Sequence, residues 1–346
     1  MLSNAKLKLL RCFAVLGVAL KVAPCVADTA DEFYRGKQIT MIIAGGVGGG
    51  YDLYARTFAR HYGKNILGSP QIIPKNIPAA GGLAGTNAVF TNPEQDGLTI
   101  GALTSSITLD PLFGAPGARF DSLQLNWIGS LGKLQNVCIT LHTSRIKTVQ
   151  DLKDNIVVMG GSGATSDSAV MPRVLNALLG TKIRLIPGYD AGAATEMAVE
   201  RGEIEGICGL GWSTLKAARP DWIRDQKLNV ILQMGMKKHQ ELPNVPMAQD
   251  FVVDPVKKRI LELILLRQEI GRPFAAPPNI PAERLKALRI GFEKTIGDPN
   301  FRKEADQVLM EIDPLNGKEI TELLHQAYGA PAHIVKQASE LVIPIQ

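Results

Sequence analysis

The sequence has few aromatic residues and few cysteines, and the shortage of cysteines excludes two classes of protein. Aromatic residues make up 5% of the 346 residues, and two of the four cysteines, Cys12 and Cys25, lie in the first 27 residues. The other two, Cys138 and Cys208, are too few for a disulfide-dependent scaffold and lack the paired spacing of a zinc site. The five histidines are scattered and form no metal-ligand pattern. We expect no metal and no cofactor.

The sequence also has almost no net charge outside its N-terminal segment. The formal charge of the chain is +5, but residues 1–27 hold four basic residues and no acidic one, which leaves 34 basic and 33 acidic residues. A nearly neutral chain gives no reason to expect binding to nucleic acid or to an anionic membrane surface.

The N-terminal segment has the pattern of a signal peptide. Lys6, Lys8 and Arg11 precede an apolar run at residues 12–20, and the segment closes on the small residue Ala27. The apolar run is too short to span a bilayer, and no longer one follows it. We therefore expect residues 1–27 to be a signal peptide and the mature protein to be periplasmic.

The first structured stretch, residues 39–62, predicts a strand, a bare loop and a helix. Residues 39–44 are apolar and rich in β-branched side chains, as in a strand buried on both faces. Five of the next six residues are glycine, and from Tyr51 the apolar residues follow helical spacing, with Asp52 near the first turn. The open N–H groups and the dipole of such a helix N-terminus favour an anion.

Two nucleotide-binding motifs do not fit this loop. A P-loop requires Lys followed by Ser or Thr at its end, and neither follows these glycines. The dinucleotide fingerprint fails because Tyr51 occupies the position of its last glycine. A nucleotide site is therefore not expected.

The same order of elements recurs further along the chain. Strands at 71–76 and 98–103 flank a helix at 83–90, and Thr104 and Ser105 follow the third strand, at the edge of a parallel sheet where ligands bind. A second strand, bare loop and helix occupy 156–159, 160–167 and 168–179. The repeat predicts an α/β fold of two lobes facing a cleft, each a parallel-core sheet flanked by helices.

We expect the chain to cross between these lobes twice, near residues 131–136 and 267–274. The predicted boundaries are 28–133 for the first segment of lobe 1, 134–268 for lobe 2, and 269–346 for the return to lobe 1 and the C-terminal helices.

The order of motifs resembles the periplasmic solute receptors of tripartite tricarboxylate transporters, often called Bug receptors. The matching stretches include ITMIIAGGVGGGYDLYAR, NIPAAGGLAGTNAVF, VVMGGSGATSDSAV and IPGYDAGAATEMAVERGEIEGICG, and they extend over nearly the whole mature chain. The resemblance implies the clam-shell fold of type II periplasmic binding proteins. It also implies a monomeric receptor, not an enzyme, that captures a small organic carboxylate and delivers it to the membrane permease subunits of such a transporter.

The resemblance also implies how the ligand is held: by backbone amides, hydroxyls and waters, without an arginine clamp. Neither bare loop contains Arg or Lys, which agrees with this expectation. Two features depart from the family pattern: Ala44 to Val47 replace the usual Pro and Phe, and Tyr51 replaces a small polar residue. The predicted ligand-binding residues are Gly46, Val47, Gly48, Gly49, Tyr51, Asp52, Thr104, Ser105, Ser162, Gly163, Ala164, Thr165, Ser166, Tyr189 and Trp212.

Several alternatives stay open at this point. Asp52 is either a helix-terminal cap or a partner for a ligand ammonium or hydroxyl group. Tyr51, Tyr189 and Trp212 either touch the ligand or pack at the lobe interface. Cys138 and Cys208 are either bonded in the oxidising periplasm or two buried thiols.

Two other functions compete with transport. A ligand-sensing receptor that feeds a signalling partner would have the same fold and site. The alternative from another class is a hydrolase, because Ser162 lies between glycines, as the serine of a nucleophile elbow nearly does. That motif, however, needs glycine at the position of Ala164.

Overall fold

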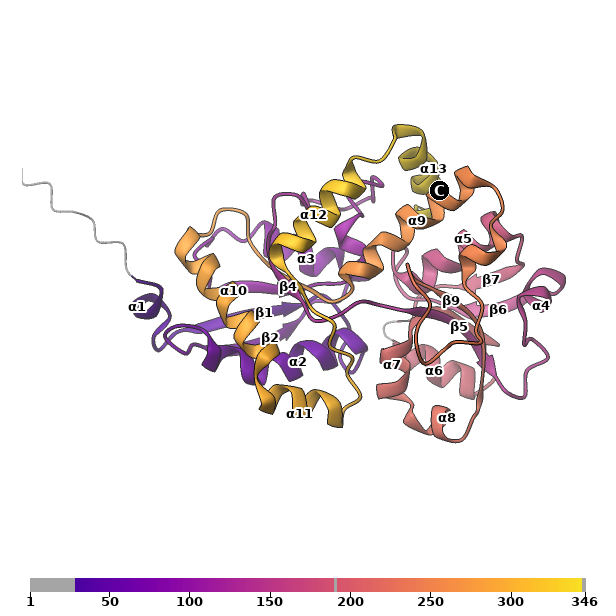
Figure 1. The fold of residues 1–346 in the computed structure, drawn as a ribbon, viewed down its shortest axis with the longest axis horizontal. Coiled ribbons are helices and arrows are strands. Elements are labelled where there is room, and N and C mark those ends of the chain that lie inside the picture. Colours follow the sequence, from indigo (N-terminus) through magenta and orange to yellow (C-terminus); the bar gives the residue numbers. More distant parts are fainter. Residues whose placement is uncertain (1–28, 190–191, 344–346) are drawn as a thin grey trace, which may run out of the picture.

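The computed structural model describes residues 29–189 and 192–343 and shows two α/β lobes side by side (Figure 1). The predicted signal peptide, residues 1–27, lies outside the described residues. Each lobe contains one sheet with helices packed around it, so the predicted fold class is confirmed. We call the lobe built on the sheet that contains β1 the first lobe, and the other the second lobe.

The first lobe contains a six-stranded sheet in the order β11-β4-β10-β3-β1-β2. Its core strands β1, β2 and β3 are parallel, whereas β10 and β11 run antiparallel to their neighbours. The strands are β1 (Gln38–Ile43), β2 (Gln71–Asn76), β3 (Thr99–Ala102), β4 (Asn126–Ser130), β10 (Pro273–Ala276) and β11 (Leu315–Asn316).

Aromatic side chains fill the core between this sheet and its helices. The ring of Phe58 lies 4.8 Å from that of Phe274 and 5.4 Å from that of Phe292 between centroids, and all three are buried. Such tilted contacts add to the free energy gained by burial. The helices that pack with this sheet are α1 (Ala30–Tyr34), α2 (Gly50–Tyr62), α3 (Leu83–Phe90), α10 (Ala282–Gly297), α11 (Pro299–Gln307) and α12 (Gly317–Tyr328), with 3₁₀ turns η1 (Gly63–Asn65), η2 (Ala80–Gly82) and η3 (Ser106–Thr108).

The second lobe contains a five-stranded sheet in the order β7-β6-β8-β5-β9. Strand β6 is parallel to β7 and β8, and β5 is antiparallel to β8 and β9. The strands are β5 (Asn136–Leu141), β6 (Val157–Gly160), β7 (Ile183–Ile186), β8 (Gly206–Gly211) and β9 (Leu228–Met234); the helices are α4 (Val149–Asp154), α5 (Asp167–Leu179), α6 (Gly192–Glu200), α7 (Trp212–Ala218), α8 (Pro220–Arg224) and α9 (Pro255–Ile270), with the 3₁₀ turn η4 (Ala248–Phe251).

The last described helix, α13 (Ala332–Val342), packs on the second lobe against α5 and α9 (Figure 1). The Arg173 guanidinium of α5 donates to the carbonyl oxygens of Leu341 at 3.3 Å and Val342 at 2.6 Å. The segment that follows β10 therefore contacts both lobes.

Two of the segments that pass between the lobes run side by side. One joins β4 to β5 and the other joins α9 to β10. The amide of Leu134 donates to Gln268 O at 2.8 Å, and Leu131 N donates to Arg272 O at 3.2 Å. These bonds make the paired segments a single hinge between the lobes.

Several short elements were not predicted. Strand β4 has five residues, and helices α7 and α8 have seven and five. Segments of this length show too few repeats of an apolar pattern to be recognised, and packing against longer neighbours stabilises them instead.

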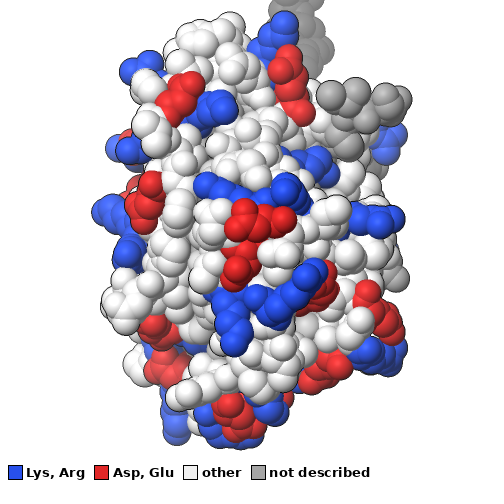
Figure 2. All heavy atoms as spheres, turned by 90° about the vertical axis from the view of Figure 1, so that its right-hand side faces the viewer, with Lys and Arg blue, Asp and Glu red and all other residues white. Residues whose placement is uncertain are grey.

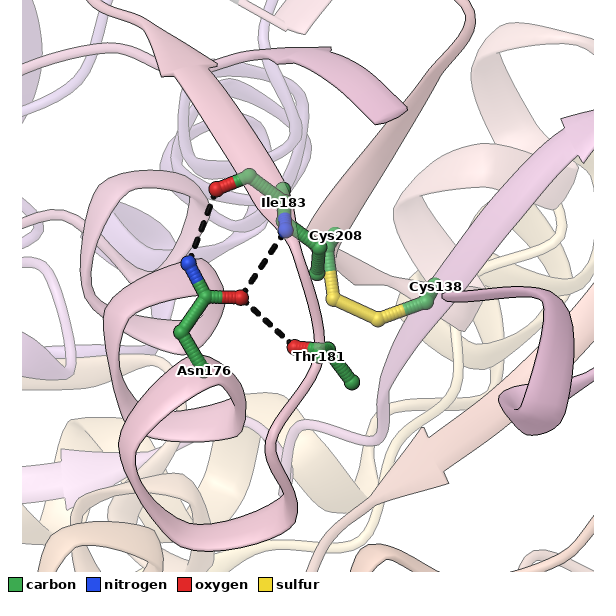
Figure 3. The surroundings of a disulfide bond; sticks show 5 residues. All are labelled: Cys138, Asn176, Thr181, Ile183 and Cys208. Atoms are coloured by element: carbon green, nitrogen blue, oxygen red, sulfur yellow. Dashed lines mark hydrogen bonds between the residues drawn. A yellow bond between two sulfur atoms is a disulfide. The ribbon is translucent and has the colours of Figure 1, made fainter. Parts of the chain in front are cut away.

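A disulfide joins Cys138 and Cys208 (Figure 3). The two residues are register partners in β5 and β8, and both are buried. The sequence left open whether these cysteines are bonded or are two buried thiols, and in the structure they are bonded. Nearby, Asn176 ties the end of α5 to β7, donating to Ile183 O at 2.8 Å and accepting from Ile183 N at 2.9 Å.

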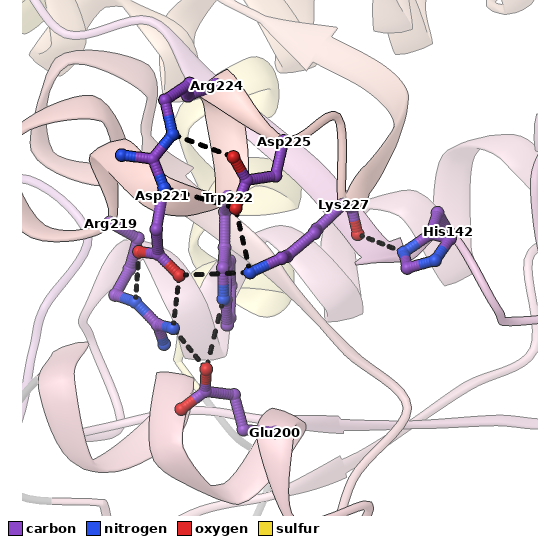
Figure 4. A network of polar contacts seen from close by, with 8 residues as sticks. All are labelled: His142, Glu200, Arg219, Asp221, Trp222, Arg224, Asp225 and Lys227. Atoms are coloured by element: carbon purple, nitrogen blue, oxygen red, sulfur yellow. Dashed lines mark hydrogen bonds and ion pairs between the residues drawn. The ribbon is translucent and has the colours of Figure 1, made fainter.

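A polar network lies around α8 in the second lobe (Figure 4). The Arg219 guanidinium bonds the carboxylates of Glu200 and Asp221, and it stacks 4.0 Å from the centroid of the Trp222 ring. Lys227 adds ion pairs to Asp221 at 3.7 Å and to Asp225 at 3.1 Å. This network joins α6 to α8 and stabilises the edge of the lobe.

Candidate functional site

A cavity of about 690 Å³ lies between the two lobes. Both bare loops line it, together with the ends of strands from each sheet. The lining residues with polar side chains are Tyr51, Thr104, Ser105, Ser106, Asn136, Ser162, Ser166, Asp167, Ser168, Tyr189, Thr214 and Arg272.

On the first-lobe side, the loop between β1 and α2 leaves its backbone open to the cavity. Gly49 is the N-cap of α2, and no side chain caps the first turn. Gly48 has a φ of +76°, a conformation that favours glycine. The N-terminus of a 13-residue helix therefore faces the cavity with the positive end of its dipole.

Tyr51 connects this loop to the end of β3. Its hydroxyl accepts from Ser105 N at 2.9 Å and donates to Ser105 Oγ at 3.1 Å or to Gly271 O at 3.3 Å. Burial raises the pKa of the Tyr51 phenol above its ordinary value, so the group is neutral at physiological pH. Tyr51 thus bonds the first loop to β3 and to the hinge.

On the second-lobe side, three serine hydroxyls cluster at the start of α5. Ser168 Oγ lies 3.2 Å from both Ser162 Oγ and Ser166 Oγ, and it accepts from Ser162 N at 3.1 Å. Ser166 is the N-cap of α5. These hydroxyls can reorient to donate, which suits recognition of an oxyanion.

The lobes touch beside the cavity. A Cβ atom added to Gly50 at the start of α2 would lie 2.7 Å from Thr214 Cγ2 of α7. Backbone from one lobe therefore packs on a side chain of the other, as expected for closed lobes.

A buried ionic cluster adjoins the cavity. Arg267, which is fully buried, pairs with Asp167 Oδ1 at 2.6 Å, and Asn136 Nδ2 donates to Asp167 Oδ2 at 2.7 Å. Asp110 is also buried, and burial raises the pKa of its carboxyl to about 7, although the charge of Arg267 opposes that rise. The cluster thus contains a carboxyl group that titrates near neutral pH.

Comparison with known families identifies the class of protein. The model of the tripartite tricarboxylate transporter family receptor, TctC, matches residues 55–339. The chain belongs to this family. Its fold and its family are therefore those of solute-binding receptors.

Solved structures show the same fold. The periplasmic binding protein BugD shares 18% identity, with a TM-score of 0.69 over 89% of this chain and 97% of that one. MatC from Rhodopseudomonas palustris, solved with bound malate, shares 15% identity, with a TM-score of 0.67 over 88% and 99%. Another R. palustris protein, solved with adipate, shares 15% identity, with a TM-score of 0.68 over 88% and 97%.

Most of the predicted site residues of this receptor line the cavity. The predicted residues found there are Gly46, Val47, Gly49, Tyr51, Thr104, Ser105, Ser162, Gly163, Ser166 and Tyr189.

Asp52 and Gly48 do not line the cavity, because they bond each other beneath the loop. The Asp52 carboxylate accepts from Gly48 N at 3.0 Å, from Arg56 Nε at 2.7 Å and from Asn76 Nδ2 at 2.8 Å. Asp52 is 4% exposed. Its contacts hold the loop at the start of α2; Asp52 lies in the first turn of that helix, and the N-cap is Gly49.

Three second-lobe residues are also absent from the lining. Thr165 is 4% exposed and lies under the loop, while Ala164 faces outward and its carbonyl accepts from Arg173 Nη2 at 2.7 Å. Trp212 is buried in the second lobe, and its Nε1 donates to Glu241 Oε2 at 2.6 Å. Trp212 thus packs within its own lobe, Ala164 is exposed, and Thr165 is buried beside Gly81 and Asp110 of the first lobe.

Sequence reasoning missed Arg272, Asp167 and Asn136 in the lining. The bare loops contain no basic residue, but Arg272 adds a cation to the lining, and the expectation that the ligand is held without an arginine stays a prediction. Arg272 lies in the hinge segment between α9 and β10 and is distant in sequence from both loops. No local pattern marks it, because only the folded hinge brings it beside Tyr51.

One group of side chains outside the cavity has the composition of a metal site. One ligand atom each from His239, Glu241 and Glu311 lies within 4.8 Å of the others. Lys216 Nζ, however, is 2.5 Å from Glu241 Oε2 and 2.7 Å from Glu311 Oε1. The ammonium group already supplies the cation, and the cluster acts as an ion-pair network between the lobes.

Proposed function

We propose that this receptor captures a small organic carboxylate in the interlobe cavity and delivers it to the membrane subunits of a tripartite tricarboxylate-type transporter. The observation that carries the proposal is the meeting of two helix N-termini, α2 from the first lobe and α5 from the second, at one cavity. Because each lobe supplies half of the site, binding favours closure.

The chemistry of the lining suits a carboxylate. The dipole of each helix contributes about 0.3–1 kcal/mol toward an anion. Hydrogen bonds from amides or hydroxyls to a charged group add about 1.5–3 kcal/mol each. Ser105, Ser162 and Ser166 are the hydroxyl groups placed to make such bonds.

The cavity also accommodates a carbon skeleton. Val47, Pro78, Leu134 and Leu210 contribute apolar surface to the lining. A volume of about 690 Å³ falls within the range of small-molecule sites. Malate and adipate, bound in the two R. palustris structures, support an aliphatic carboxylate as the ligand class.

The proposed receptor acts in the periplasm as a monomer and binds neither nucleic acid nor a membrane surface. Among the described residues, no helix is long and apolar enough to span a membrane. On the face at the second-lobe end, basic and acidic side chains are interspersed (Figure 2). This mixture offers no single-sign patch to a polyanion.

The proposed role is binding and not catalysis. Ser162 Oγ has another serine hydroxyl, Ser168 Oγ, as its neighbour, and no histidine is among the described residues that line the cavity. A serine nucleophile would need a base at this position.

A thermal-shift screen tests the proposal. A ligand that binds only the folded protein stabilises it by about 2.7 kcal/mol at a hundredfold excess over its dissociation constant. Malate, adipate and aromatic carboxylates are expected to raise the melting temperature without being consumed, with neutral sugars as controls. Stabilisation by sugars alone would overturn the proposal.

Uptake in membrane vesicles separates transport from sensing. Vesicles that contain the permease subunits should accumulate the carboxylate only when the purified receptor is added. Carboxylate binding without any receptor-dependent uptake would favour the sensor.

A further inference from the structure

Arg272 is a buried cation in the lining of the cavity. Arg272 is 2% exposed, and in the chain it lies in the hinge segment directly before β10. The guanidinium stacks 3.6 Å from the centroid of the Tyr54 ring and lies 5.4 Å from that of Tyr51. Its Nη2 donates to Thr214 Oγ1 at 2.8 Å and to Ser213 Oγ at 3.3 Å.

This charge has no carboxylate partner among the described residues. No Asp or Glu oxygen in that part of the chain comes within the 4.0 Å of an ion pair, and Nε and Nη1 make no hydrogen bond there. The phenol of Tyr51 does not supply a negative charge, because burial raises its pKa.

Among the described residues of the lining, the other charged side chain is paired. Asp167 bonds the Arg267 guanidinium at 2.6 Å. Arg267 and Arg272 are both buried and five residues apart, yet only Arg267 has a counter-charge. Among the described lining residues, Arg272 is thus the charged side chain without an ionic partner.

Two neutral hydroxyls and two aromatic rings surround the Arg272 guanidinium, and they compensate its buried positive charge only in part. Cation–π contacts offset part of the cost of desolvation, and a carboxylate would offset much more. The planar guanidinium also bonds a carboxylate through two parallel hydrogen bonds, which fixes its orientation.

We propose that Arg272 is the counter-charge of the ligand carboxylate and thereby determines the preference of this receptor for anions. This inference rests on the proposed carboxylate function and deepens it. It replaces the expected recognition by amides and hydroxyls alone with an ionic contact.

The position of Arg272 also couples ligand binding to lobe closure. Its backbone belongs to the hinge, where Arg272 N donates to Ser130 Oγ at 3.1 Å. Its side chain reaches Ser213 and Thr214 of α7 in the second lobe. A carboxylate held by Arg272 is therefore held where both lobes meet.

The test measures preference for charge, which a merely structural residue would not change. Malate, adipate, hexanoate and benzoate are titrated calorimetrically into the wild type, and the tightest binder is compared with its amide analogue, in which no carboxylate remains. In Arg272→Met the ratio of the two affinities is expected to fall about tenfold or more. Arg272→Lys, which keeps the charge, is expected to retain most of that ratio.

The matched control is Arg289→Met, which removes a half-buried arginine outside the cavity. The Arg289 side chain donates to Trp127 O at 2.9 Å in the first lobe. This variant is expected to keep the wild-type ratio. If Arg272→Met does not fold, as judged by its melting curve without ligand, Arg272→Gln provides the same comparison.

The outcomes separate the two proposals. An unchanged preference for the carboxylate in the neutral variants would overturn the role of Arg272 and leave the carboxylate function standing. Failure of the wild type to bind any of the four anions would overturn the function, and the role of Arg272 with it.

Discussion

Gly163 of the second lobe packs directly on Gly81 of the first. A Cβ atom added to Gly163 would lie 2.5 Å from Gly81 N and 2.8 Å from Gly81 Cα. Only a residue without a side chain permits this approach of two backbones. The pair therefore marks a point at which the closed lobes meet beside the cavity.

Gly163→Val is expected to disfavour closure. The added side chain would collide with the backbone of the first lobe, so ligand affinity should fall at least tenfold while the fold is retained. Calorimetry gives the affinity, and small-angle scattering with ligand present gives the more open shape. Gly297→Val is the control, because Gly297 has open space around its Cα. Wild-type affinity in Gly163→Val would show that the contact does not limit closure.

Ser162 and Thr165 are expected to differ, although they belong to one loop. Ser162 lines the cavity, so Ser162→Ala should weaken carboxylate binding about tenfold through loss of a hydrogen bond to charge. Thr165 is buried outside the lining, so Thr165→Ala should leave the affinity within about threefold. Titrations of both variants check this, and equal losses would place Thr165 at the ligand.

The disulfide between Cys138 and Cys208 is expected in protein exported to the periplasm. It closes a segment with a sequence separation of 70, so its loss should lower the free energy of unfolding by about 4 kcal/mol in the chain-entropy model. Denaturant unfolding of the Cys138→Ser, Cys208→Ser double variant measures this. Mass spectrometry after alkylation without reductant tests the bond itself, and two alkylated cysteines would rule it out.

Asp110 is expected to make stability depend on pH. Burial raises the pKa of its carboxyl to about 7, from 3.8, even though Arg267 lowers it and Asp167 adds to the rise. Within that interval the folded state binds more protons than the unfolded state, so stability falls as pH rises, by at most about 1.4 kcal/mol per pH unit.

Asp110→Asn removes this titration. Relative to the wild type, the variant should gain stability steadily between pH 4 and pH 7 and change little above that, in urea unfolding followed from pH 4 to pH 9. Asp306→Asn, which removes an exposed carboxylate, is the matched control. Parallel pH curves for Asp110→Asn and the wild type would show that burial does not perturb Asp110.

Local patterns in the sequence predicted the main elements well. The strand at 71–76 and the helix at 83–90 have the predicted bounds, and α2 begins one residue before Tyr51. Apolar periodicity and glycines act within a few residues, so these features are readable without a fold. The two bare loops and their hydroxyls were found for the same reason.

The sequence by itself determined the two α/β repeats, the glycine loops and half of the polar residues of the cavity. Only the tertiary structure decided that Cys138 faces Cys208, that Asp52 is enclosed in its own lobe, and that Arg272 enters the lining. These outcomes depend on which distant segments pack together at the hinge and across the sheets. Whether a charged side chain is buried or paired depends on that packing, so it cannot be read from any single stretch of sequence.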